Sequence, residues 1–204
     1  MTTSRRDFLR AALFGAAGAG VFVATPTAVA GTSPGDVEIL NYALALEYLQ
    51  SSFYTEAERR GALTGEARTA ARVVGSVERA HVKALRDALG AQAIERPFYD
   101  FQGTTENEEA FLKTAVAFED LGTAAYKGQV HLIDSPQVLA AAISIHSVEA
   151  RHAAWIRYLA GVLPAADGLD EPRSRNEVLA IVERTGFVVS APRTEGRATP
   201  PFTG

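Results

Sequence analysis

Residues 76–81 read SVERAH and residues 147–152 read SVEARH, so the chain carries nearly the same six-residue pattern twice. In each copy a histidine follows a glutamate by three residues, a spacing that puts both side chains on one face of a helix. Apolar and small neighbours indicate that this face points inward, where an unpaired charge is costly. The four residues that therefore need a common partner are Glu78, His81, Glu149 and His152.

A second pattern is repeated upstream of each copy. Residues 45–49 read ALEYL and residues 117–121 read AFEDL. Their glutamates, Glu47 and Glu119, precede the glutamates of the first pattern by 31 and 30 residues, which predicts two helical hairpins of the same design. If the hairpins turn near positions 62 and 134, each glutamate lies about 23 Å from its turn at 1.5 Å per residue. All four glutamates can therefore share one layer.

Helical periodicity dominates the chain and predicts an all-α fold. The expected helices cover residues 36–60, 64–89, 106–133, 134–160 and 175–185, and Asp36 is the expected N-cap of the first. Residues 90–105 lack a helical stripe but can span up to roughly 50 Å when extended. The prediction is a four-helix bundle over residues 35–162, with a long crossover between its second and third helices. A C-terminal extension, residues 163–204, would add one short helix.

The first 30 residues have the features of an export signal rather than of a folded element. Arg5 and Arg6 are followed by Phe8 and Leu9, which resembles the twin-arginine motif that the export machinery reads. An apolar stretch and a small-residue cleavage pattern follow. The apolar run of about 14 residues is shorter than the ~20 needed to span a bilayer, so we expect no stable membrane anchor. The expected location is periplasmic or extracellular.

The composition of the 204 residues restricts the chemistry further. Cysteine is absent, which excludes disulfides, zinc fingers, iron–sulfur clusters and thiol nucleophiles. The formal net charge is −4, and no block of Lys or Arg occurs beyond the N-terminus, so we expect no nucleic-acid partner. Any bound metal must be held by nitrogen and oxygen atoms.

The repeated residues match a known metal-binding arrangement. One glutamate from each of two helices, together with Glu-x-x-His from each of two others, is the ligand set of di-iron and di-manganese bundles. Carboxylates and imidazoles suit Fe or Mn, and Zn is also compatible. Four carboxylates offset the charge of two divalent ions. The predicted metal ligands are Glu47, Glu78, His81, Glu119, Glu149 and His152.

Two longer motifs resemble the ferritin-like superfamily. They are FEDLGTAAY at residues 118–126 and VEARHAA at residues 148–154. Within that superfamily they are similar to a branch of desiccation-related plant proteins and exported bacterial homologues, and the resemblance covers roughly residues 35–162. It implies that the first and third helices supply terminal or chelating glutamates. It also implies that Glu78 and Glu149 are bridging ligands and that each metal receives one imidazole.

The resemblance and the ligand set lead to two functional hypotheses. The first is an exported protein that oxidises Fe²⁺ or handles oxygen or peroxide at a carboxylate-bridged di-metal site. The second is a non-enzymatic bundle that protects other components during stress or drying, with structural metal or none. Both hypotheses are compatible with a homo-oligomer, and neither names a substrate.

Three further side chains lie near the predicted ligands. Tyr54 and Tyr126 follow Glu47 and Glu119 by seven residues, which puts them on the same helix face. Core packing is the simpler interpretation, while an electron relay or a hydrogen bond to a ligand remains an alternative. His146 precedes a predicted ligand by three residues, but its counterpart in the first hairpin is a glycine. We therefore expect a partly exposed histidine that does not bind metal.

Overall fold

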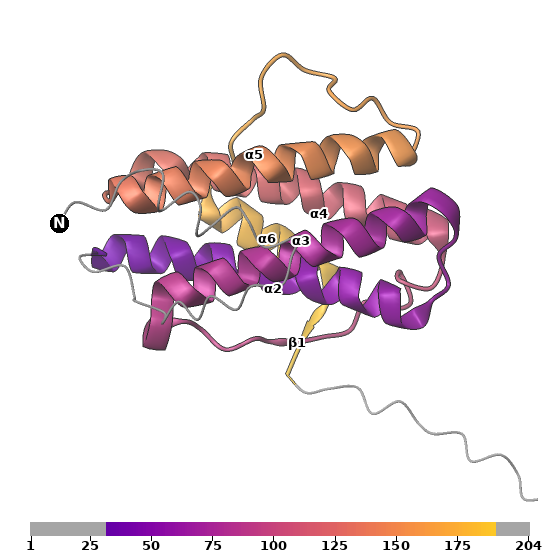
Figure 1. Cartoon of the computed structure of the whole chain (residues 1–204), viewed down its shortest axis with the longest axis horizontal. Helices are drawn as coiled ribbons and strands as arrows, with labels where there is room; N and C mark the ends of the chain where they lie inside the picture. Colours follow the sequence, from indigo (N-terminus) through magenta and orange to yellow (C-terminus); the bar gives the residue numbers. More distant parts are fainter. Residues whose placement is uncertain (1–31, 191–204) are drawn as a thin grey trace, which may run out of the picture.

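The computed structural model describes residues 32–190, and the predicted export signal lies outside the described residues. Four long helices form an antiparallel bundle in which α2 packs against α3 and α4 packs against α5 (Figure 1). A shorter helix, α6, follows the bundle, so the all-α prediction is confirmed. The helices are α2 (Pro34–Arg60), α3 (Gly65–Leu89), α4 (Glu108–Gln129), α5 (Pro136–Leu159) and α6 (Arg175–Thr185).

The first helix begins two residues earlier than its predicted start. Ser33 is the N-cap and accepts a hydrogen bond from the Asp36 N–H at 3.1 Å, because Pro34 is suited to the first helical position. The prediction that Asp36 caps the helix is therefore wrong. Asp36 is completely buried and accepts hydrogen bonds at 2.9 Å from the backbone N–H groups of Asp134 and Ser135. This carboxylate joins the start of α2 to the start of α5.

The start of α4 also differs from the prediction. Asn107 is its N-cap and accepts a hydrogen bond from the Ala110 N–H at 3.0 Å, so the preceding Glu106 lies outside the helix. The helix ends at Gln129 and continues as a short 3-10 turn, η2 (Val130–Leu132). The remaining helix ends agree with the predicted ones to within two residues.

The connection between α3 and α4 runs along the bundle from one end to the other, as predicted (Figure 1). It begins with a 3-10 turn, η1 (Gly90–Gln92), and contains a short strand, β1 (Phe98–Tyr99). This strand pairs antiparallel with β2 (Val188–Val189), which follows α6. Sequence periodicity did not predict this pairing, because each strand has two residues and the partners lie about ninety positions apart. The pairing fastens the C-terminal extension to the crossover.

The segment between α5 and α6 crosses α4 at very close range. The Arg173 N–H donates to the Ala124 carbonyl at 3.1 Å, although that carbonyl belongs to a helix. A Cβ atom at Gly128 would lie 1.9 Å from the Arg173 carbonyl oxygen, so a side chain does not fit there. Beyond the crossing, α6 buries Val178 completely in a cluster with Tyr42, Leu46, Leu121 and Ala125. The extension thus covers the α2–α4 face of the bundle.

The bundle core differs between its two ends. One end is filled by an aromatic cluster that includes Phe53, Phe101, Phe111, Phe118 and Phe187. The other end is filled mainly by aliphatic and small residues of α2, α3 and α5, together with Tyr48 and Tyr126. None of the helices within residues 32–190 is long and apolar enough to cross a membrane.

Candidate metal centre

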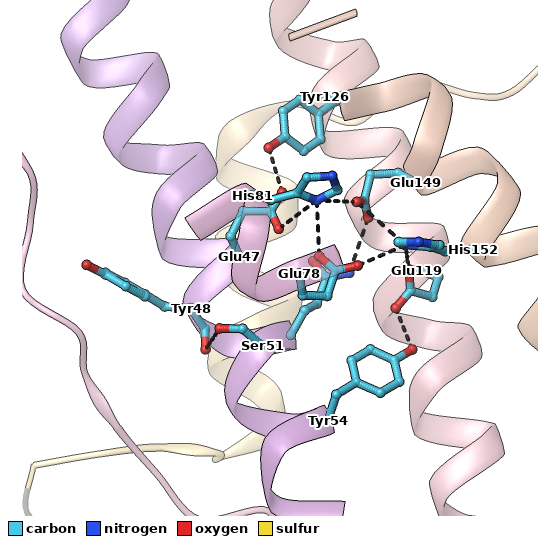
Figure 2. A network of polar contacts seen from close by, with 11 residues as sticks. Glu47, Tyr48, Ser51, Tyr54, Glu78, His81, Glu119, Tyr126, Glu149 and His152 are labelled. Atoms are coloured by element: carbon cyan, nitrogen blue, oxygen red, sulfur yellow. Dashed lines mark hydrogen bonds and ion pairs between the residues drawn. The ribbon is translucent and has the colours of Figure 1, made fainter. Parts of the chain in front are cut away.

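The structure brings all six predicted residues together inside the bundle (Figure 2). They form two groups, and within each group one candidate ligand atom per residue lies within 4.8 Å of the others. Two glutamates belong to both groups and therefore lie between the two imidazoles, as bridging ligands would. The first group is Glu47, Glu78, His81 and Glu149, and the second is Glu78, Glu119, Glu149 and His152.

Each glutamate directs one oxygen toward the histidine nitrogens. His81 Nδ1 lies 3.1 Å from Glu149 Oε1 and 3.4 Å from Glu47 Oε2. His152 Nδ1 lies 2.8 Å from an oxygen of Glu78 and 3.5 Å from one of Glu119. These contacts lack the alignment of hydrogen bonds, and among residues 32–190 the four oxygens have no hydrogen-bond partner. Since all four glutamates are completely buried, the unmet oxygens fit a cation bound between them.

The second oxygens of Glu47 and Glu119 are held by the two tyrosines in a crosswise manner. Tyr126 on α4 donates a hydrogen bond to Glu47 Oε1 on α2 at 2.6 Å. Tyr54 on α2 donates to Glu119 Oε1 on α4 at 2.5 Å (Figure 2). Core packing alone therefore does not explain these two tyrosines, because their hydroxyls also orient the carboxylates of Glu47 and Glu119. The hydrogen-bond alternative is confirmed.

Glu149 is held by a residue that the sequence did not single out. Gln50 Nε2 donates to Glu149 Oε2 at 3.3 Å, and the Gln50 side chain is buried. The position that duplicates Gln50 in the second hairpin is Gly122. A Cβ atom there would lie 3.0 Å from Glu149 Oε2, so the glycine leaves room for this pair. Gln50 lies three residues after Glu47, a spacing that places both side chains on one helix face. Because the second hairpin has a glycine at the duplicated position, the repeat gave no reason to select Gln50.

Comparison with known proteins identifies the family. A model for the ferritin-like domain matches residues 35–162, more than half of the chain. The chain belongs to the ferritin-like family. No curated protein matches the sequence. The buried glutamates and histidines of this ferritin-like domain are compatible with a metal site, as the fold and the donor set both indicate.

Two of the buried glutamates and both histidines of the ferritin-like centre hold protons more strongly than usual. Burial raises the pKa of Glu47 to about 7, although the nearby His81 opposes this shift. Burial also raises the pKa of Glu119. For His152, burial alone would lower the pKa, but contact with the carboxylates of Glu119 and Glu78 raises it to about 10. The facing carboxylates likewise raise the pKa of His81 well above its usual value, despite burial. Metal binding must therefore displace protons.

Arginines outside the centre reinforce each ferritin-like hairpin in the same way. Arg157 on α5 makes two hydrogen bonds of 2.8 Å to the carboxylate of Asp120 on α4. At the duplicated position, Arg86 on α3 donates to the Tyr48 hydroxyl on α2 at 2.9 Å. Both acceptors directly follow a predicted ligand glutamate in sequence, so each arginine fixes the helix turn that carries the ligand.

Two further residues lie close to the candidate ligands in sequence. Arg79 pairs with Glu58 at 2.8 Å, outside the centre. His146 is half buried and belongs to neither group of candidate ligands. Its counterpart Gly75 lies where a Cβ atom would be 2.8 Å from Tyr54 Cβ. This close approach of α2 and α3 leaves no room for a side chain at position 75, so a histidine does not fit there.

Proposed function

We propose that this ferritin-like chain holds two metal ions, Fe or Mn, with Zn also compatible. One ion would be bound through Glu47 and His81 and the other through Glu119 and His152. Glu78 and Glu149 would bridge them. The observation that carries the proposal is the set of four unmet carboxylate oxygens facing two imidazole nitrogens in a fully buried layer.

The chemistry of the donor set supports this choice of metals. Oxygen and imidazole ligands suit hard and borderline cations. Four carboxylates and two divalent ions also balance in charge, which removes much of the cost of burying either alone. When bound, such ions supply Lewis acidity and redox equivalents.

We further propose that the centre oxidises Fe²⁺ or reacts with oxygen or peroxide. In the simplest reaction, two ferrous ions each lose one electron, and dioxygen takes two electrons and two protons to become hydrogen peroxide. The protein's own contribution is positional. Tyr54 and Tyr126 orient the terminal carboxylates, Gln50 orients one bridging carboxylate, and the surrounding helices exclude bulk water from all four glutamates.

Export to the periplasm or the extracellular space is also part of the proposal. It rests on Arg5, Arg6 and the apolar stretch that follows them, and thus on the sequence alone. Twin-arginine export carries proteins that are already folded, so the metal could be inserted before export. The absence of cysteine agrees with a centre built from oxygen and nitrogen ligands.

Metal analysis of the purified protein with a matched pair of variants tests the proposal. We expect about two metal equivalents per wild-type chain and less than one in Glu78→Gln, because Glu78 belongs to both ligand groups. Glu66→Gln changes an exposed glutamate on the same helix and should bind metal as the wild type does. Anaerobic loading with Fe²⁺ followed by oxygen or peroxide would then measure oxidation.

The outcome separates the two functional hypotheses. Two bound ions and a measurable oxidation rate would exclude the non-enzymatic bundle. Less than one ion per wild-type chain, with the fold unchanged in Glu78→Gln, would exclude the di-metal centre and leave the protective, desiccation-related role.

A further inference from the structure

A small apolar cavity lies inside the bundle beside the metal centre. Its volume is about 30 Å³, and almost no polar atom reaches its surface. Residues from α2, α3, α4 and α5 line it, together with Ile133 in the connection between η2 and α5. The lining includes Ala43, Leu46, Leu85, Ala125, Tyr126 and Ala142.

The cavity adjoins one side of the centre. Tyr126 lines it and also donates the hydrogen bond to Glu47. Leu85 and Ile145, which line it too, lie about one helical turn from His81 and Glu149 on their own helices. The cavity is therefore next to the Glu47 and His81 side of the centre.

The duplication of the chain shows that this space is specific to one half. The positions that duplicate Ile39, Leu46 and Ala125 of the cavity are occupied by Phe111, Phe118 and Phe53 in the other half. The Phe53 ring lies 5.2 Å from the ring of Phe111 and 5.1 Å from that of Phe118, centroid to centroid. Equivalent positions of the two halves are thus occupied by aromatic rings at one end of the bundle and line a cavity at the other.

The size and polarity of the cavity restrict its occupant. A buried water needs two to four polar partners, and apolar cavities of proteins stay dry and bind xenon or small apolar molecules. Burial of a peroxide molecule without hydrogen bonds would be unfavourable for the same reason. A volume of 30 Å³ suits a diatomic gas better than an organic substrate.

We propose that this cavity binds dioxygen and delivers it to the Glu47 and His81 side of the centre. The inference rests on the proposed function and narrows it, because it selects dioxygen over peroxide as the oxidant that the fold accommodates. It also makes the two metal positions unequal, since the aromatic cluster closes the corresponding route to Glu119 and His152.

Xenon binding tests the cavity without any metal. We expect xenon in the cavity of the metal-free wild-type protein, detected by crystallography under xenon pressure or by ¹²⁹Xe NMR. Ala142→Leu should fill the cavity and abolish the xenon signal. If the leucine disturbs folding, Ala43→Val fills the cavity with a smaller side chain and should give the same result. Ala140→Leu is the control, because residue 140 is exposed on the same helix.

Oxidation kinetics test the delivery of dioxygen. In Fe²⁺-loaded Ala142→Leu, we expect the oxygen-dependent rate to fall about tenfold, while the peroxide-dependent rate and the metal content stay as in Ala140→Leu. No xenon in the wild-type cavity would overturn the inference, as would an unchanged oxygen-dependent rate in a folded variant that has lost xenon. If the wild type binds no metal, the proposed function fails, but the xenon result still decides whether the cavity accepts an apolar gas.

Discussion

The hydroxyl of Tyr54 provides a direct test of how the protein orients its carboxylates. Tyr54→Phe removes the 2.5 Å hydrogen bond to Glu119 Oε1 and keeps the ring, which packs at 5.4 Å from Phe53 and 5.8 Å from Phe111. The buried oxygen then has no donor, which costs about 1 to 3 kcal/mol. For a domain of this size, the melting temperature of the metal-free protein should fall by about 2 to 12 °C.

The same substitution should weaken metal binding in a pH-dependent manner. Burial raises the pKa of Glu119, and the hydrogen bond from Tyr54 opposes that shift. Without the hydroxyl the pKa rises further, so protons compete better with the metal and the pH midpoint of metal binding moves upward. Differential scanning calorimetry measures the loss of stability, and metal titrations at several pH values between about 5 and 8 measure the shift of the binding midpoint.

Two other tyrosines act as controls for Tyr54→Phe. Tyr126→Phe removes the duplicated hydrogen bond to Glu47 and should have the same effects, whereas Tyr158 is 67% exposed and its Phe variant should resemble the wild type. If Tyr54→Phe matches Tyr158→Phe in both stability and metal affinity, the hydroxyl orients nothing and the ring alone is important. That result would refute our interpretation of the crosswise pairs.

Three further predictions concern the rest of the molecule. The metal-free protein should lose stability as pH rises, first between about pH 4.5 and 7 as Glu47 ionises in a buried site, then between about 6.5 and 10 as His152 loses its proton. Thermal melts across that range should show this decline, and bound metal should reverse it. Gly128→Ala should displace the Arg173 carbonyl from α4 and expose the α5–α6 connection to limited proteolysis, with the bundle retained by circular dichroism. Asp36→Ala should remove the two hydrogen bonds of this buried carboxylate and lower the free energy of urea unfolding by about 2 to 5 kcal/mol. An unchanged midpoint would contradict the proposed junction of α2 with α5.

The fold and the location of the centre could be predicted from the sequence because both depend on the spacing of residues within one helix or one hairpin. A glutamate and a histidine three residues apart share a helix face in any fold. The matched distances from the turns put Glu47, Glu78, Glu119 and Glu149 at one depth without knowledge of how the hairpins pack. These properties are local to a helix or a hairpin, and the structure brings the six residues together accordingly.

The features that were missed depend on contacts between hairpins. The hydroxyl of Tyr54 finds Glu119 because α2 packs against α4, which no spacing within either helix reveals. The strand pair between residues 98–99 and 188–189 is equally remote in sequence. Asp36 was assigned as a cap because its side chain suits that position. The helix starts at Pro34, two residues earlier, and the buried Asp36 carboxylate accepts hydrogen bonds from backbone N–H groups at the start of α5.

The positions where the duplication fails are more informative about chemistry than the positions where it holds. The predicted ligands themselves are duplicated, which would make the two proposed metal positions equivalent. Gln50 and Gly122 break the symmetry at Glu149, which accepts a hydrogen bond from the Gln50 amide, whereas no amide within residues 32–190 donates to Glu78. The cavity and the aromatic cluster break it again at the two ends of the bundle. Since each position has its own carboxylate orientation and its own access, we expect the two ions to bind with different affinities and the oxidant to approach from the Glu47 side.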